Sequence, residues 1–515
     1  MTNIEQNPEE DVGLHKLKHS GSVLARTAHG TSWLIGWRLA NRALGFISTL
    51  FLARLLSPSD FGIVALAMGF MQSLNQLSEL GTENAIIRDE KHDRAIYDTG
   101  FTINLIRGSL VALLIFILAA PAAEFFHSPH FEQVVWLAAL ISFLNGFENI
   151  GIVDFRRFMA FNYEFKLKII PRIISAVTAI LLAFILRNFW ALIIAILVNQ
   201  IITLAMSYVL HPYRPRLTLQ AWRRMASYST MLWFSNLIGL AGGFGTKSII
   251  GKISGIASVG IYEVGIDFAS LTTSELAGAF SRALFPGFAE LRKAGKDASE
   301  MIPRVIGIMA LVTFPAGVGI SLISYPIVQL ALGSKWLNAV PIIEILAITR
   351  SLTILGVIST TYFSVHGWMK TIVSINAIGG IIQIILLVFL IPNYGLYGIA
   401  LSVASAETII QFCFYSIVSY SLHISISKTL SMVWRSVIGC LIMSIILYMM
   451  NLGWTHESSH IASNLSAAYK LGITIAIGSA IYIGVISILW FFSPNKYNSP
   501  EVDLLNQVKK IMVRN

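Results

Sequence analysis

The chain has 515 residues, of which 55% are hydrophobic and only 12% are charged, whereas about 25% of the residues of soluble proteins are charged. Apolar runs long enough to cross about 30 Å of hydrocarbon recur from near the N-terminus almost to the C-terminus. The formal net charge of +10 does not indicate a nucleic-acid binder, because the basic residues are spread over many short loops. These features exclude a soluble protein and predict an all-α, polytopic membrane protein.

The predicted elements follow one another with short connections. Residues 1–30 mix acidic and basic side chains and lack the short apolar core of a secretory signal, so we expect a cytosolic tail. From there on, hydropathy and helix-breaking residues predict about fourteen transmembrane helices. We expect them near residues 31–56, 61–80, 99–120, 131–153, 168–186, 189–210, 228–252, 259–283, 303–326, 338–363, 371–391, 396–420, 430–450 and 469–492.

The basic residues of the loops predict the orientation. Lys and Arg in short loops resist translocation and so mark the cytosolic side. Counting from a cytosolic N-terminus, the segments 88–94, 156–168 and 214–224 each carry three or more basic residues, whereas the alternate loops carry almost none. Both termini are therefore expected in the cytosol.

Two pairs of segments indicate an internal repeat. ARLLSPSDFGIVALA (53–67) aligns with GKISGIASVGIYEVG (251–265), and LLAFILRNFWAL (181–192) aligns with LLVFLIPNYGL (386–396). Chance likeness between apolar segments is the alternative. Because six is an even number, both six-helix halves begin in the cytosol, and the repeat is parallel. Two such lobes are expected to enclose a central cavity.

The repeat predicts the domain organisation. After the tail at 1–30, we expect an N-terminal lobe at 31–227 and a C-terminal lobe at 228–421, with six helices each. The remaining residues, 422–515, are expected to form two further helices and a cytosolic C-terminal tail.

Three stretches carry a family resemblance when taken in order. They are Arg54-x-Leu56-x-Pro58-x-Asp60-Phe61-Gly62, then Phe285-Pro286, then IPNYGLYGIA at 391–400. This arrangement resembles the polysaccharide flippases of the multidrug, oligosaccharidyl-lipid and polysaccharide exporter superfamily. In the first stretch, Pro58 is expected to end one helix, and Ser59 or Asp60 to cap the next.

The resemblance implies a function. Such proteins move undecaprenyl-diphosphate-linked oligosaccharide across the bacterial inner membrane for exopolysaccharide, capsule or O-antigen synthesis. The implied mechanism is alternating access driven by a coupling ion, H⁺ or Na⁺, and no other cofactor is expected. A polysaccharide polymerase and a chain-length regulator are the partners that this role suggests, and we expect a monomer that is not an enzyme.

The first predicted helix carries a polar stripe that includes Arg38 and Arg42. At about 1.5 Å per residue Arg42 lies roughly 15 to 18 Å from the cytosolic end, where an uncompensated Arg costs about 3 kcal/mol. Arg107, Lys247 and Arg350 are further cations expected inside the bundle. Guanidinium groups match phosphate oxygens two at a time, so these five residues are candidates for contacting the diphosphate. Structural ion pairs or snorkelling to an interface would explain the same charges.

Carboxylates inside predicted helices are candidates for ion coupling, because a buried carboxylate is a common carrier of H⁺ or Na⁺. Asp267 lies on a polar stripe of the span 259–283 and is the first candidate. Glu263, Glu344 and Glu407 are the others. A structural pair with Lys247 or Arg350 remains an equal explanation.

Two other function classes stay open. An ion-coupled multidrug exporter of the same superfamily would favour cationic drugs and an acidic cavity. A membrane enzyme, such as a polymerase or a lipid-dependent glycosyltransferase, would need a large outer loop. The longest one expected here, about 451–468, is short and lacks paired carboxylates.

Overall fold

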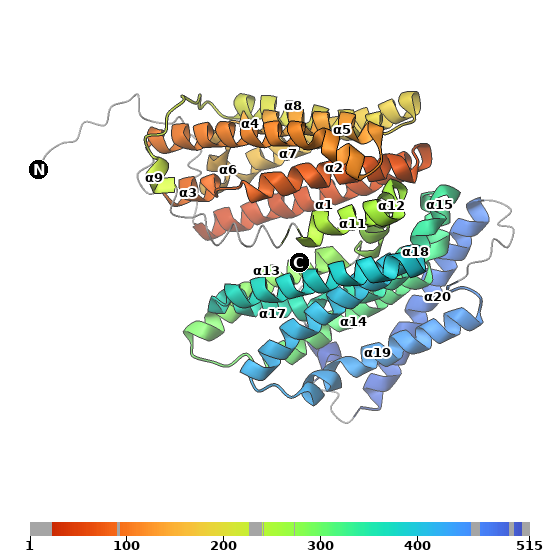
Figure 1. Cartoon of the computed structure of the whole chain (residues 1–515). Helices are drawn as coiled ribbons and strands as arrows, with labels where there is room; N and C mark the ends of the chain where they lie inside the picture. The colour runs from red at the N-terminus through yellow and green to blue at the C-terminus, as the bar shows by residue number, and fades with distance from the viewer. Residues whose placement is uncertain are drawn as a thin grey trace, which may run out of the picture. The chain divides into compact units, whose positions relative to one another are not determined.

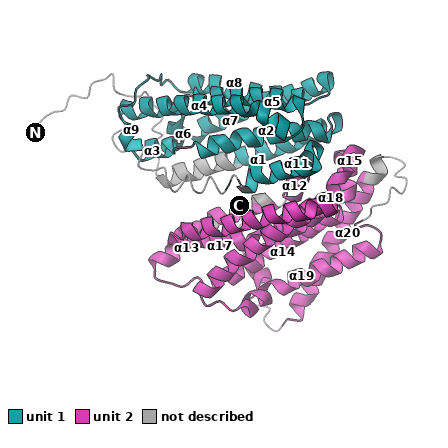
Figure 2. Cartoon of the chain, viewed as in Figure 1, with its two compact units in different colours: residues 1–260 teal, residues 261–515 magenta. Residues whose placement is uncertain are grey.

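The computed structural model describes residues 23–89, 93–225, 239, 241–271, 273–454, 464–493 and 499–506. Every regular element within these ranges is helical, which confirms the all-α prediction. The chain divides into two compact units, residues 1–260 and 261–515 (Figure 1, Figure 2). The boundaries that the repeat predicts for the two lobes stay a prediction.

Unit 1 is a bundle in which α4 packs on α5, α7 on α8 and α1 on α7. Its elements are α1 (Val23–Leu55), α2 (Pro58–Leu77), α3 (Thr82–Arg88), α4 (Arg94–Phe125), α5 (Pro129–Gly146), η2 (Ile150–Ile152), α6 (Val153–Arg157), α7 (Phe161–Leu186), α8 (Trp190–Leu210), α9 (Trp222–Met225), η4 (Ala241–Gly245), α11 (Thr246–Ser254) and the first turn of α12 (Ile256–Ala269).

In unit 2, α14 packs on α16 and α19, α17 packs on α18, and α19 packs on α20. Its elements are the rest of α12, then α13 (Thr273–Lys293), α14 (Met301–Leu322), α15 (Ser324–Ala331), η5 (Ser334–Ala339), α16 (Val340–Ser351), α17 (Thr353–His366), α18 (Met369–Ser421), α19 (Ile426–Met449) and α20 (Asn464–Phe491).

The helices confirm a multi-pass membrane protein. Within the described residues, seven helices are long and apolar enough to cross a bilayer, and nine spans result if two bent helix pairs are counted. These pairs bend by 70° after α5 and by 43° between α16 and α17. The seventh predicted span, 228–252, lies partly outside the described residues, and the count of fourteen stays a prediction.

The junction of α1 and α2 corrects the expected helix cap. Pro58 begins α2 at its first position, and Ser57 is the N-cap in place of the expected Ser59 or Asp60, with Asp60 completing the cap from the third helical position. The Ser57 hydroxyl accepts from the Asp60 N–H at 3.3 Å, and the Asp60 carboxylate accepts from the Ser57 N–H at 2.9 Å. This capping box satisfies two backbone donors at a helix start, so the signature stretch builds a sharp turn.

The first turns of α2 and α12 approach each other through two glycines within unit 1. A Cβ on Gly62 would overlap the carbonyl of Ile256, and a Cβ on Gly260 would overlap the carbonyl of Pro58. The repeat alignment equates Gly62 with Gly260 and Pro58 with Ile256. The contact is therefore reciprocal, as between elements related by a two-fold axis.

We expect Gly62→Ala to destabilise this contact by about 1–3 kcal/mol, because the added methyl meets backbone that cannot move aside. The apparent thermal midpoint of the purified protein measures the loss. Gly36→Ala on α1 is the matched control, because among the described residues nothing lies within 4 Å of its added Cβ. Equal midpoints for the two variants would contradict the close approach.

The predicted helix at 259–283 is wrong as one continuous span. The structure ends α12 at Ala269 and begins α13 at Thr273. The Ile266 carbonyl accepts from both the N–H and the hydroxyl of Ser270, the residue that follows the end of α12. The polar stripe expected around Asp267 is consequently divided between two helices.

The motif at 391–400 marks a break inside α18. Gly395 has φ +54° and ψ −125°, so two helices meet there, as the predicted spans 371–391 and 396–420 require. Residues with a side chain rarely adopt this conformation. A Cβ on Gly398 would overlap the Leu390 carbonyl, so the second glycine is needed for the close return of the chain.

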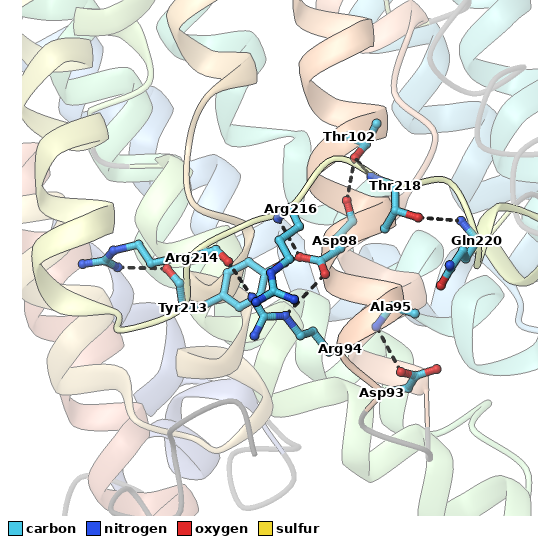
Figure 3. A network of polar contacts seen from close by, with 10 residues as sticks. All are labelled: Asp93, Arg94, Ala95, Asp98, Thr102, Tyr213, Arg214, Arg216, Thr218 and Gln220. Carbon is cyan, nitrogen blue, oxygen red and sulfur yellow. Dashed lines mark hydrogen bonds and ion pairs between the residues drawn. The ribbon is translucent and has the colours of Figure 1, made fainter. Parts of the chain in front are cut away.

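The segment that follows α8 is fastened to the first turns of α4 (Figure 3). The Asp98 carboxylate accepts hydrogen bonds from the Arg216 N–H at 2.8 Å and from the Tyr213 hydroxyl, and lies 3.4 Å from Arg94. Burial, followed by the hydrogen bond to Asp98, raises the pKa of Tyr213. The phenol therefore stays a neutral donor, and the anchor is stable across the neutral pH range.

Backbone groups further along the same segment bind two threonines of α4. The Thr218 N–H donates to the Thr102 hydroxyl at 3.0 Å, and the Ala221 N–H donates to the Thr99 hydroxyl at 3.1 Å. Residues 213–221 thus belong structurally to unit 1.

Residues 499–506 pack on α14 and α19 of unit 2, which the predicted C-terminal tail did not anticipate. Arg435, which is 5% exposed, lies 2.9 Å from the Glu501 carboxylate. A Cβ on Gly307 of α14 would lie 2.5 Å from the Pro500 ring. The segment is held by a buried ion pair and a close glycine contact.

Candidate functional site

Two arginines, Arg42 of α1 and Arg172 of α7, lie on helices that pack on each other in unit 1. The Arg172 guanidinium of α7 lies against Gly45, with one nitrogen 3.2 Å from the position of an added Cβ. Gly45 is three residues after Arg42 and belongs to the same polar stripe of α1. The missing side chain at Gly45 lets Arg172 approach α1 one turn from Arg42, and we call Arg42 and Arg172 the arginine pair.

The arginine pair has no acidic partner among the described residues. One terminal nitrogen of Arg42 and the Nε of Arg172 are buried without a hydrogen-bond partner there. A buried donor left without an acceptor costs about 1–3 kcal/mol, so each such group requires an explanation. An anion that accepts from both guanidinium groups would supply the missing acceptors.

Two other predicted cations of unit 1, Arg38 and Lys247, lie in surroundings that differ from those of the arginine pair. Arg38 is exposed, whereas Arg42 is half-buried. Lys247 of α11 lies beside α2, with its Cδ 3.4 Å and its Nζ 3.9 Å from the position of an added Cβ on Gly69. The structure therefore places Arg42, and not Arg38, in protein surroundings.

Arg107 of α4 lines a polar cavity of about 510 Å³ in unit 1. One terminal nitrogen donates to the Asn75 carbonyl at 3.3 Å, and its Nε is buried without a partner among the described residues. Glu79 and Glu83 lie within electrostatic reach of the guanidinium. Arg107 thus belongs to a mixed cluster of charges and is not part of the arginine pair.

The predicted cation Arg350 and the predicted coupling carboxylate Glu407 form an ion pair in unit 2. The Arg350 guanidinium on α16 lies 2.9 Å from the Glu407 carboxylate on α18. Tyr262 of α12 lies within electrostatic reach of this pair. Two candidates that the sequence suggested for different roles therefore form one ion pair between α16 and α18.

Glu344 and Asp267, two other predicted carboxylates of unit 2, differ in their surroundings. Glu344 accepts a hydrogen bond from the Ser324 hydroxyl at 3.2 Å. Asp267 is exposed and lies near the end of α12. Glu407 is the candidate for which the structure shows an ion pair with Arg350.

An apolar cavity of about 470 Å³ lies between α14, α19 and α20 of unit 2. Its walls include Pro315, Ala316, Met443, Leu447 and Ile475. Such walls offer very few hydrogen-bond partners and therefore suit a hydrocarbon chain and not a sugar or a phosphate.

Arg172 is not among the five cations that the sequence suggested for contacting the diphosphate. The signal that could have found it is Gly45, a residue without a side chain on a stripe of polar ones, which leaves room for a long neighbour. The apolar cavity carries no comparable signal, because its wall residues are ordinary membrane-helix residues.

Comparison with known proteins identifies relatives in cell-surface polysaccharide synthesis. The family described as "Polysaccharide biosynthesis protein" matches residues 51–341. The succinoglycan biosynthesis transport protein ExoT of Rhizobium meliloti is 24% identical over 327 residues, which cover 62% of this chain and 66% of that protein. The lipopolysaccharide biosynthesis protein WzxC of Escherichia coli is 21% identical over 345 residues, 65% of this chain and 69% of that protein.

Solved structures share the fold at low sequence identity. The lipid II flippase MurJ in an inward closed conformation is 14% identical, with a TM-score of 0.70 over 88% of this chain and 99% of that one. An inward-facing multidrug resistance MATE family transporter of the MOP superfamily is 15% identical, with a TM-score of 0.54 over 74% of this chain and 94% of that one. The chain therefore has the fold of these solved transporters, and the relative ExoT is itself named as a transport protein.

Proposed function

Because the chain belongs to the polysaccharide biosynthesis protein family, whose match covers residues 51–341, we propose that it is a lipid-linked oligosaccharide flippase. Its substrate would be an undecaprenyl-diphosphate-linked oligosaccharide repeat unit, moved from the cytosolic to the outer leaflet of the bacterial inner membrane. The product would serve exopolysaccharide, capsule or O-antigen synthesis. The names of the relatives from succinoglycan and lipopolysaccharide synthesis support this assignment.

The arginine pair is the observation that carries the proposal. A diphosphate that crosses the hydrocarbon layer must be compensated, because an unpaired charge there is costly. Arg42 and Arg172 offer two guanidinium groups with buried N–H donors that lack acceptors among the described residues. Guanidinium binds phosphate oxygens in a two-pronged geometry, so the pair fits the charged part of such a lipid.

The apolar cavity between α14, α19 and α20 supports the same substrate. A polyprenyl chain is pure hydrocarbon, and burying it in a cavity of about 470 Å³ costs no hydrogen bond. The apolar cavity of unit 2 is therefore a candidate for binding hydrocarbon of such a lipid.

Two six-helix lobes, each starting in the cytosol, would alternately open a central cavity to either side. The reciprocal contact of Gly62 and Gly260 supports the parallel repeat, because equivalent residues meet each other. With fourteen helices both termini would face the cytosol. We propose a monomer that works beside a polysaccharide polymerase and a chain-length regulator.

The ion pair of Arg350 and Glu407 is proposed as the coupling element. Binding of H⁺ or Na⁺ at Glu407 would neutralise the carboxylate and release Arg350, so that one ion changes the contact between α16 and α18. The released guanidinium of Arg350 would then be available to form an ion pair with an anionic group of the substrate.

We expect Glu407→Gln to remove the response of transport to an imposed ion gradient and to slow gradient-driven transport by at least about tenfold, or 1.4 kcal/mol. Proteoliposomes with an imposed pH or Na⁺ gradient measure this response. Glu344→Gln is the comparison on the same helix as Arg350, because the Glu344 carboxylate accepts a hydrogen bond from Ser324. A full gradient response in Glu407→Gln would contradict the coupling role.

Deletion of the gene in its native host tests the function. We expect loss of one surface polysaccharide and accumulation of its lipid-linked repeat unit on the cytosolic leaflet, both restored by a plasmid copy. Unchanged polysaccharide together with increased sensitivity to cationic drugs would instead identify a multidrug exporter.

A further inference from the structure

The polar cavity of unit 1 is lined by residues that suit neither a diphosphate nor a hydrocarbon tail. It has a volume of about 510 Å³, within the range of small-molecule sites, and lies between α2, α3, α4 and α5. Its walls carry several carboxamides and carboxylates beside Arg107. We call the cavity formed around Asn75, Glu79, Asn104, Arg107 and Asn145 the amide pocket.

Local hydrogen bonds fix part of the wall. The Ser142 hydroxyl donates to the Asn75 side-chain oxygen at 3.3 Å, and the Thr82 hydroxyl donates to that of Asn104 at 3.0 Å. With its oxygen engaged, the Asn104 amide keeps its NH₂ group as a donor toward the cavity. The buried Nε of Arg107 is a second donor that lacks an acceptor among the described residues.

The mixture of charges excludes simple ions as the occupant. A free phosphate would lie near Glu79, which repels it. A metal cation would lie near Arg107, which repels it. Arg156 lies 2.8 Å from Glu83 and 2.9 Å from Glu164, so these charges compensate one another.

A neutral ligand rich in hydroxyl groups fits this wall. Each hydroxyl both donates and accepts hydrogen bonds, so it can pair with carboxamides, a carboxylate and a guanidinium at the same time. We propose that the amide pocket binds a sugar residue of the lipid-linked oligosaccharide and makes the protein prefer the glycosylated lipid to bare undecaprenyl diphosphate. This inference rests on the proposed function and names the part of the substrate that unit 1 recognises.

The preference for the glycosylated lipid would come from polar groups of the amide pocket that bare undecaprenyl diphosphate leaves without hydrogen-bond partners. A site built to hydrogen-bond a hydroxyl rejects a ligand without it, because the polar groups of the site are then left without partners. Two or three such bonds correspond to an affinity ratio of about 30-fold to 150-fold between the two lipids.

The test compares two probes on the full-length protein in nanodiscs. The probes are undecaprenyl diphosphate and the undecaprenyl-diphosphate-linked oligosaccharide extracted from the host strain. We expect Asn145→Leu, which alters an exposed wall residue, to weaken binding of the glycosylated probe by at least about tenfold and to leave the bare probe unchanged. Glu79→Leu, a second exposed wall variant, should act in the same direction.

Asn393→Leu is the matched control, since Asn393 is an exposed carboxamide of unit 2 that bonds only its own helix at Phe389. Equal losses for both probes, or an unchanged Kd of the glycosylated probe in both pocket variants, would overturn the sugar site while leaving the flippase proposal intact. Failure of the wild-type protein to bind either probe would instead overturn the proposed function and the sugar site with it.

Discussion

Replacing Arg42 by glutamine is expected to slow translocation of the lipid-linked oligosaccharide by about tenfold to hundredfold, because a charge-assisted hydrogen bond contributes about 1.5–3 kcal/mol. Arg172→Gln should have a similar effect, since both guanidinium groups have buried N–H donors without acceptors among the described residues. Arg42→Lys should retain part of the rate, because an ammonium group keeps the charge but loses the two-pronged geometry. The rate in proteoliposomes, normalised to the amount of inserted protein, is the measurement.

Arg38→Gln provides the comparison on the same helix. Arg38 is exposed one turn before Arg42, so its replacement should change the rate much less. Wild-type rates in both Arg42→Gln and Arg172→Gln would contradict the proposal that the arginine pair binds the diphosphate. A loss in Arg38→Gln as large as in Arg42→Gln would show that general positive charge matters and not the pair.

Arg435→Met is expected to destabilise unit 2 by about 3–5 kcal/mol, because it leaves Glu501 without its cation in a protein interior. The guanidinium lies 2.9 Å from the carboxylate, and the two side chains are 6% and 11% exposed. The contact is mainly electrostatic, since it lacks the alignment of a hydrogen bond. A lower apparent thermal midpoint and faster proteolysis of the C-terminal segment are the expected observations.

The double variant Arg435→Met/Glu501→Leu tests whether the instability of Arg435→Met comes from the unpaired charge of Glu501. Replacing both partners of a buried ion pair by apolar residues is often neutral or stabilising, so the midpoint should return close to the wild-type value. A double variant as unstable as the single one would contradict this account. The docking of residues 499–506 would then depend on contacts such as Pro500 against Gly307.

Much of the fold could be predicted from periodicity and loop charge. Segments such as 168–186 and 430–450 fall within α7 and α19, because a membrane helix needs a continuous apolar stretch. The break between α12 and α13 could not be predicted, since the segment has neither proline nor glycine between Asp267 and Thr273 to mark a helix end. The docked C-terminal segment was missed because its few charged and apolar residues resemble an ordinary tail.

The sequence could identify the charged residues of the candidate site but not which of them contact one another. The stripe of α1 identified Arg42 as a residue that faces protein, and the structure places it there half-buried. Arg350 and Glu407 are distant in sequence, and only the packing of α16 and α18 reveals that they neutralise each other. Charge type can be read from a helix pattern, whereas a partner on another helix depends on tertiary packing.

The most direct test of the flippase assignment is translocation by the purified protein alone. Fluorescently labelled undecaprenyl-diphosphate-linked oligosaccharide is incorporated into proteoliposomes, and a membrane-impermeant reagent reports how much of it reaches the opposite leaflet. We predict protein-dependent translocation that Arg42→Gln and Arg172→Gln reduce. Translocation equal to that of protein-free liposomes, with correctly folded and inserted protein, would contradict the proposed function.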